Sequence, residues 1–234
     1  MGKESNGFSF KDLLIDVGAQ TADEVKKLGV KPGDYVNLEK ESHVLNHKFF
    51  SGKAVDNRSG CVAMILMMEA LKDVKTEATI YACGTVQEEI GLKGAKVLTR
   101  SINPTVALCI DVGLATEQDE LNPDAARCYL GKGPAIELYD WNPESCSGNI
   151  VPKKLVKALE AAAQKAEIPY QHSVLIRCGT DACEMAYTND GIITGGISIP
   201  EKYIHTTIGV VGIEDVVHAS MLGAQYIKDF QKTL

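Results

Sequence analysis

The chain has 234 residues, with 24 basic and 31 acidic side chains and a formal net charge of -7. Its hydrophobic fraction of 45% and charged fraction of 24% are typical of a globular protein that is long enough to fold without disulfide staples. The acidic balance and the lack of any Lys/Arg-rich stretch argue against nucleic acid as a partner.

The first 50 residues have the character of a small β-rich unit. The expected elements are a strand at 13–17, a helix at 21–28 that Thr21 caps, and strands at 35–38 and 44–50. The hydrophobic pattern of the sequence changes at Ser51-Gly52, where longer apolar segments begin. We therefore divide the chain into a partial β-rich domain, residues 1–50, and an α/β domain, residues 51–234.

Strand-like and helix-like segments alternate regularly in the second part. The expected strands are 78–86, 105–110 and 192–199, and the expected helices are 59–72, with Ser59 as its cap, 92–99, 153–165, 180–189 and 213–230. The apolar positions of helix 59–72 occur all round it, which indicates burial. Nearly continuous apolar strands with helices between them indicate a sheet that is covered on both faces. The predicted fold is an α/β sandwich.

Neither a signal peptide nor a membrane span is predicted. The first ten residues are polar, and the longest apolar run, 61–68, is far shorter than the roughly 18 residues that a spanning helix needs. The seven cysteines form no C-x-x-C pair, which favours reduced core thiols, with a cysteine nucleophile as the alternative. We expect a soluble, cytoplasmic protein with no membrane partner.

Acidic residues and one histidine stand at the ends of predicted elements. Asp56 precedes helix 59–72, Glu88 and Glu89 follow strand 78–86, Asp111 follows strand 105–110, and His205 follows strand 192–199. The carboxyl ends of the strands in an open α/β sheet converge on one edge, where ligands bind. Negative charge concentrated there costs folding energy unless cations neutralise it.

Each of these residues also has an ordinary structural explanation. Asp56 and Asp111 fit turns, Glu88 fits the first turn of a helix, and His205 fits an exposed loop. Together, however, they offer three carboxylate ligands, one imidazole and a spare Glu beside a ligand. Oxygen and imidazole donors without thiolates suit zinc, cobalt or manganese in a hydrolytic centre. In an adjacent Glu pair, one carboxylate can bind the metal while the other accepts a proton from the attacking water.

Six ordered stretches carry a resemblance that covers nearly the whole chain. They are KAVDNRSG, GTVQEEIGLKGA, ALCIDVG, LGKGPAI, CGTDA and ISIPEKYIH. On these motifs the chain resembles the glutamyl aminopeptidase family of co-catalytic metallopeptidases, whose members build tetrahedral (TET-type) assemblies and some of which carry endoglucanase labels. The resemblance implies a three-layer α/β/α sandwich with a mixed sheet. It also implies that residues 1–50 are a remnant of the family's inserted β-rich dimerisation domain.

The resemblance also implies roles for individual residues. Asp56 corresponds to the carboxylate that bridges two metals, Glu89 and Asp111 to terminal ligands, His205 to the last imidazole ligand, and Glu88 to the general base. The implied reaction is removal of the N-terminal residue from peptides by metal-activated water, with zinc or cobalt, or manganese, as the metal. Substrate-binding residues are not assigned.

The departures from the family pattern limit these expectations. Members carry an H-x-D motif before the insertion, and this chain has none, so about the first third of a typical member is missing. We expect one metal in place of two, impaired peptidase activity, and a homo-oligomer with weakened dimer contacts. The alternatives are a non-catalytic scaffold that retains the fold, or a deacylase or carboxypeptidase on the same metal centre.

Overall fold

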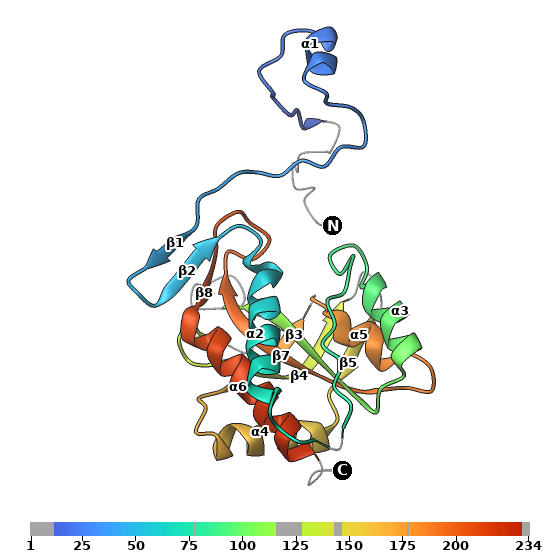
Figure 1. Cartoon of the computed structure of the whole chain (residues 1–234), viewed down its shortest axis with the longest axis vertical. Coiled ribbons are helices and arrows are strands. Elements are labelled where there is room, and N and C mark those ends of the chain that lie inside the picture. Colours follow the sequence, from blue (N-terminus) through green and yellow to red (C-terminus); the bar gives the residue numbers. More distant parts are fainter. Residues whose placement is uncertain (1–11, 77, 116–127, 143–146, 177, 231–234) are drawn as a thin grey trace, which may run out of the picture. The chain divides into compact units, whose positions relative to one another are not determined.

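The computed structural model describes residues 12–76, 78–115, 128–142, 147–176 and 178–230 (Figure 1). The chain divides into two compact units, Met1–Leu38 and Glu39–Leu234. In the first unit, Thr21 caps helix α1 (Ala22–Lys27) as expected, since its hydroxyl accepts a hydrogen bond from the Glu24 N–H at 3.3 Å. The strands expected at 13–17 and 35–38 do not form, because a short strand without a partner leaves its backbone unpaired.

The second unit contains the remaining elements. They are β1 (His43–Leu45), β2 (Phe49–Gly52), α2 (Val55–Leu71), α3 (Lys93–Ile102), β3 (Val106–Leu114), β4 (Ala135–Asn142), β5 (Ser147–Ile150), α4 (Lys153–Lys165), β6 (Gln171–Ile176), α5 (Asp181–Ala186), β7 (Ile193–Lys202), β8 (Gly209–Gly212) and α6 (Ile213–Asp229).

The strands form one mixed sheet. Its main path runs β1-β2-β8-β7-β4-β5, with β3 beside β7 and β6 beside β4. The β3–β7 and β4–β6 pairs are parallel, and the other pairs are antiparallel. Strand β3 pairs with β7 over its full length, from Val106 opposite Ile193 to Leu114 opposite Glu201. The carboxyl ends of these two parallel strands therefore lie at the same edge of the sheet, as the sequence predicts.

Helices cover the sheet on both faces (Figure 1). Alternate residues of β7 show the division: Ile197 and Ile199 join a buried core with Leu155 of α4 and Leu222 of α6. Ser198, pointing the other way, donates a hydrogen bond to the buried carboxylate of Glu137 at 2.8 Å. The mixed α/β fold expected from the sequence is confirmed.

Most of the expected elements in this unit are present. The differences are one missing strand, several strands that were not expected, and a different position for one expected helix cap. Residues 78–86 form no strand, although they are as apolar as the segment that became β3. Strands β4, β5 and β8 were not predicted, because Glu137 and Asp140 interrupt the apolar residues of β4, and β5 and β8 have only four residues each. The expected helix cap Ser59 lies inside α2, where its hydroxyl donates to the Val55 carbonyl at 3.0 Å.

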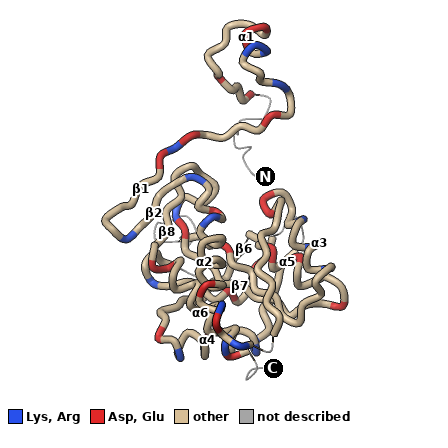
Figure 2. Tube along the Cα trace, in the orientation of Figure 1, with Lys and Arg blue, Asp and Glu red and all other residues tan. Residues whose placement is uncertain are grey.

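In Figure 2 the Lys and Arg positions are scattered among Asp and Glu positions on several elements. No helix among the described residues is long and apolar enough to cross a membrane.

Candidate metal centre

The start of α2 places Asp56 beside the end of β3. The backbone of Asp56 and Asn57 is not helical, and the regular helix begins after them. The Asn57 side chain accepts a hydrogen bond from the Gly60 N–H at 2.8 Å and donates one to the Ile110 carbonyl at 2.9 Å. A side chain at position 60 would collide with both partners, since an added Cβ would lie 2.3 Å from Asn57 Oδ1. Asn57 and Gly60 therefore fix Asp56 next to Asp111, the residue after Ile110.

A tight loop before α3 carries the two adjacent glutamates. The carbonyl of Glu88 accepts hydrogen bonds from the N–H groups of Gly91 and Leu92, at 3.1 and 2.9 Å. Gly94 then donates to the Val86 carbonyl at 2.9 Å, an approach so close that an added Cβ would lie 2.4 Å from that oxygen. The backbone of this loop is thus determined on both sides of the pair.

The ends of the parallel strands supply the other two residues. Asp111 lies in β3 opposite Ser198 of β7 and is 7% exposed. His205 follows β7 and has a φ of 59°, a left-handed conformation that is uncommon outside glycine and often found at functional sites. His205 thus follows β7 as expected, whereas Asp111, expected just after strand 105–110, lies within β3, three residues before its end.

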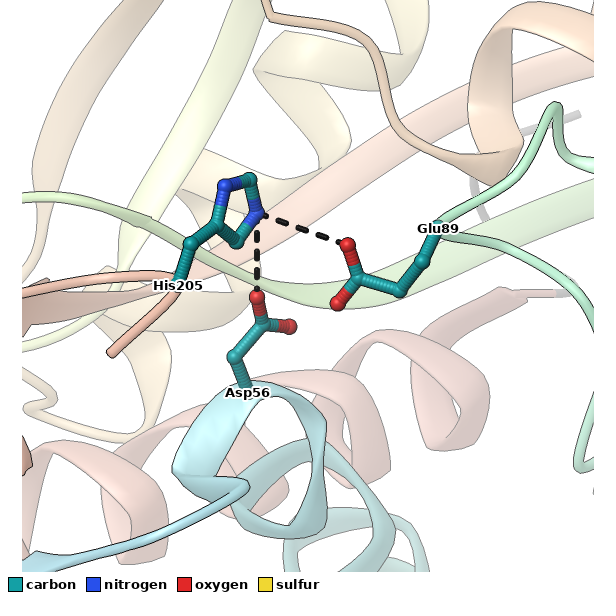
Figure 3. A group of neighbouring side chains, drawn as sticks. All are labelled: Asp56, Glu89 and His205. Atoms are coloured by element: carbon teal, nitrogen blue, oxygen red, sulfur yellow. Dashed lines mark ion pairs between the residues drawn. The ribbon is translucent and has the colours of Figure 1, made fainter. Parts of the chain in front are cut away.

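Three of the five predicted site residues form a group of potential ligands (Figure 3). One ligand atom each from Asp56, Glu89 and His205 lies within 4.8 Å of the other two. His205 Nε2 lies 3.4 Å from Asp56 Oδ2 and 3.5 Å from Glu89 Oε2. The Asp56 side chain is 15% exposed, whereas those of Glu89 and His205 are 57% and 68% exposed. The group is therefore anchored at one end and open to solvent at the other.

The separation of the donor atoms fits a shared cation. Donors that each lie about 2.1 Å from a tetrahedral zinc are about 3.4 Å from one another. The two measured separations of 3.4 and 3.5 Å match this value. Asp111 is outside the group of three, and its Oδ1 accepts a hydrogen bond from the Val112 N–H at 2.8 Å. The residues present thus fit one zinc-type ion with three protein ligands.

The carboxylates around this group hold protons more tightly than usual. Burial, together with the negative charges of Asp111 and Asp181, raises the pKa of Glu88 to about 8. Burial and the charge of Glu89 raise the pKa of Asp56 to about 6. Burial raises the pKa of Asp111 to about 7. Such shifts are expected where acids crowd together without a cation, and they are typical of functional sites.

Sequence reasoning missed three residues that shape the site. Asn57 was not recognised, although it stands between the candidate ligand Asp56 and the regular part of the helix, where caps occur. Thr85 donates a hydrogen bond to Asp181 Oδ2 at 2.6 Å and so joins the approach to the glutamate pair to the start of α5. Glu201 is 1% exposed and close enough to Asp56 for its pKa to be raised, by burial first, to about 8. It stands between Pro200 and Lys202, just after the expected strand 192–199, a position that gave no signal of a buried acid.

The other histidines stay outside the group. His172 Nε2 lies 2.8 Å from the Glu160 carboxylate, in an exposed pair far along the sequence from the ligands. His43 and His47 are exposed, and His218 lies on α6.

The chain is similar to proteins that are named as aminopeptidases. Residues 2–222 match the M42 glutamyl aminopeptidase family. The glutamyl aminopeptidase of Lactococcus lactis is 30% identical over 212 residues, which are 90% of this chain and 57% of that protein. The lysyl aminopeptidase of Pyrococcus furiosus is 29% identical over 232 residues, 98% of this chain and 63% of that protein.

Solved structures give the same result. An aminopeptidase of Desulfurococcus kamchatkensis superimposes with a TM-score of 0.83 and 37% identity, over 92% of this chain and 58% of that one. The TET1 peptidase of Pyrococcus horikoshii, which can assemble into a tetrahedron or a large octahedral shell, has a TM-score of 0.81 and 31% identity, over 96% and 63%. This chain thus spans about three fifths of the length of these relatives. The family match covers nearly all of it, and the chain belongs to the M42 glutamyl aminopeptidase family.

Proposed function

We propose that this chain is the metal-binding part of an aminopeptidase that removes N-terminal residues from peptides. The observation that carries the proposal is the group formed by Asp56, Glu89 and His205, whose donor atoms have the spacing of ligands around one cation. Family membership supports the reaction type, and the adjacent Glu88 supports the chemistry.

In this proposal each residue has one role. Asp56, Glu89 and His205 hold a divalent cation such as zinc or cobalt, with Asp111 adding negative charge beside Asp56. A bound cation would polarise the scissile carbonyl and lower the pKa of water. Glu88 accepts a proton as water attacks and then delivers it to the leaving amine. In the metal-free chain burial raises the pKa of Glu88 to about 8, and a cation beside Glu89 would lower it toward the range in which a carboxylate accepts a proton near neutral pH.

We propose one tightly held metal per chain. The described residues bring three ligands together at one point only, and Asp111 is outside that group. A second cation would have only Asp111 and the shared Asp56 as protein ligands, too few for tight binding.

Residues 1–50 are proposed to be the remnant of a dimerisation domain. Val44, Leu45 and Phe50 of β1 and β2 are 58%, 43% and 37% exposed, and exposed apolar edges of this kind favour self-association. Homo-oligomers of lower order than a dodecamer are expected. Light scattering that shows a uniform dodecamer would contradict this part.

A panel of aminoacyl-nitroanilides, with zinc or cobalt added, tests the reaction. Turnover of free aminoacyl substrates that Glu88→Gln abolishes supports the proposal. Hydrolysis restricted to N-acylated or C-terminal substrates indicates a deacylase or carboxypeptidase. Metal binding without turnover of any substrate indicates a non-catalytic scaffold, the alternative that the lack of an H-x-D motif in this chain favours.

A further inference from the structure

Helix α5 is joined to the chain on both sides of the two adjacent glutamates. We call residues 85–92, which carry this pair, the glutamate loop. At its start, Thr85 Oγ1 donates a hydrogen bond to Asp181 Oδ2 at 2.6 Å. After its end, Lys96 of α3 pairs with Glu184 at 2.8 Å. Helices α3 and α5 lie side by side (Figure 1). Asp181 and Glu184 are three residues apart, a spacing that places side chains on one side of a helix.

The two contacts differ in how far they are buried. Asp181 is 7% exposed, whereas the side chain of Lys96 is 65% exposed. A hydrogen bond to a buried carboxylate contributes more to stability than an exposed ion pair, which water screens. Within the described parts of the chain, no other hydrogen bond joins residues 79–88 to a position outside 79–94. The Thr85–Asp181 contact is therefore the hydrogen bond that can fix where the glutamate loop begins.

Asp181 is held in turn by a buried acid of β4. The Asp140 Oδ2 atom accepts hydrogen bonds from Thr180 Oγ1 at 3.3 Å and from Cys183 Sγ at 3.2 Å. The other oxygen of Asp140 accepts the Asn149 N–H of β5 at 2.5 Å. Asp140 and Thr180 are 2% and 4% exposed. One buried side chain of the sheet thus anchors the chain on both sides of Asp181, so that the Asp181 carboxylate has a fixed place.

The internal hydrogen bonds of the glutamate loop fix its shape but not its position. The Glu88 carbonyl accepts the N–H groups of Gly91 and Leu92, which belong to the loop itself. The Glu89 carboxylate, however, has to reach His205 Nε2, which follows β7 and lies 3.5 Å away. A displacement of about 1 Å near such a site can cost about 100-fold in rate. A contact between the loop and the rest of the protein is needed to prevent that displacement.

We propose that Asp181 is a positioning residue of the candidate metal centre, which acts through its hydrogen bond to Thr85. This hydrogen bond fixes the place of the glutamate loop, so that Glu89 reaches the other two ligands. The same loop then presents Glu88 to the attacking water. The roles of the two glutamates rest on the proposed function. The place of the loop does not, and it can be measured without metal or turnover.

Hydrogen–deuterium exchange of the whole chain in EDTA measures how firmly the loop is held. Thr85→Val removes the hydroxyl and keeps both the size of the side chain and the charge of Asp181. The amides of residues 91–94 donate to the carbonyls of residues 86–88, and in this variant they should exchange about tenfold faster or more, because the loop opens more often. Thr85→Ser keeps a hydroxyl and should exchange like the original chain. Lys96→Gln removes the exposed pair with Glu184, and as the matched control it should change the exchange less than about twofold.

Zinc titration and kinetics test the role of the contact in the site. Thr85→Val should weaken zinc binding about tenfold, as the loss of a group that orients a ligand does. At saturating zinc it should lower kcat on an aminoacyl-nitroanilide about tenfold with little change in KM, since Glu88 acts in the chemical step. Thr85→Ser should restore both values. In an Asp181→Ala background, Thr85→Val should have almost no further effect, because the hydrogen bond is already lost.

Unchanged exchange at 91–94 in Thr85→Val, or equal effects of Thr85→Val and Lys96→Gln, would overturn the proposal. Faster exchange with unchanged zinc affinity and kcat would also overturn it, since the contact would then stabilise the fold alone. If the original chain neither binds zinc nor turns over a substrate, the proposed function fails, and the exchange data alone decide whether Asp181 holds the loop.

Discussion

Two carboxylates near helix starts, Asp215 in α6 and Asp56 in α2, have opposite surroundings. Asp215 is 1% exposed, and its two oxygens accept hydrogen bonds from the N–H groups of Gly131 and Gly133, at 2.6 and 2.8 Å. Asp56 faces Glu89 and His205, and its ion pair with the histidine is 3.4 Å long. The first carboxylate is fully satisfied by the protein, whereas the second lies among like charges.

This difference separates a structural acid from a candidate ligand. The glycines of LGKGPAI are spaced like an anion-binding loop, and the anion that they bind is the protein's own Asp215. Burial of a charge is tolerated there because N–H donors compensate it. Among the described residues no backbone N–H group donates to the Asp56 carboxylate, so a cation would stabilise this charge more than that of Asp215. The predictions below test this contrast, starting with the largest effect.

Glu88→Gln should reduce peptidase activity by about 100-fold or more, the usual contribution of a general base. Metal content should not change, because Glu88 is assigned the proton and Glu89 the ion. Initial rates on an aminoacyl-nitroanilide, measured beside zinc content, check both points. Loss of zinc in this variant would mean that the roles of the two glutamates are reversed.

His205→Ala should weaken zinc binding by about 100-fold or more, since even residues that only orient a ligand typically contribute 10–100-fold. Isothermal titration with zinc measures the change. His172→Ala is the matched control, because His172 pairs with Glu160 away from the ligand group and should leave the affinity unchanged. Equal effects of the two changes would show that the ligand group is not the zinc site.

Asp215→Asn should lower the free energy of unfolding by about 1–3 kcal/mol, because the new amide N–H₂ faces an N–H donor in a buried place. Zinc affinity should change little. Asp73→Asn, at an exposed position, is the control for the change of charge. A large loss of zinc binding in Asp215→Asn with unchanged stability would break the distinction between the two carboxylates.

The stability of the metal-free chain should fall as the pH rises from about 5 to about 8. Asp56, Glu88 and Glu201 have pKa values raised to about 6, 8 and 8, above the usual 3.8 and 4.5 of an unfolded chain. In this window the folded chain holds protons that the unfolded chain has released, so rising pH favours unfolding. Urea unfolding at several pH values measures the trend. Zinc should reduce it, and stability that rises over this range without metal would contradict the assignment.

The sequence predicts those helices and strands whose own residues show a clear hydrophobic pattern. The helices at 153–165 and 213–230 have a clear periodicity, and strand 105–110 has the apolar run of a buried strand. Segment 78–86 has the same kind of run but no partner strand among the described residues, and it forms no strand. An apolar run predicts a strand only where a neighbour is available to pair with it.

The sequence also predicts those site residues that stand at the ends of elements, but not those whose contacts depend on tertiary packing. Asp56, Glu89 and His205 stand at element ends, and the parallel pairing of β3 with β7 brings such ends together. Thr85 and Asp181 could not be paired from the sequence, because their hydrogen bond depends on how α5 packs against the loop. Glu201 stands between Pro200 and Lys202, after the expected strand 192–199, and only the register of β7 with β8 shows that it is buried near Asp56.

Zinc content after incubation and exhaustive dialysis tests the central claim most directly. Elemental analysis should give close to one zinc per chain, and close to none in Asp56→Ala or His205→Ala, while Asp215→Asn keeps its zinc. Two tightly held zinc ions per chain, or a zinc content that none of these ligand changes alters, would contradict the account.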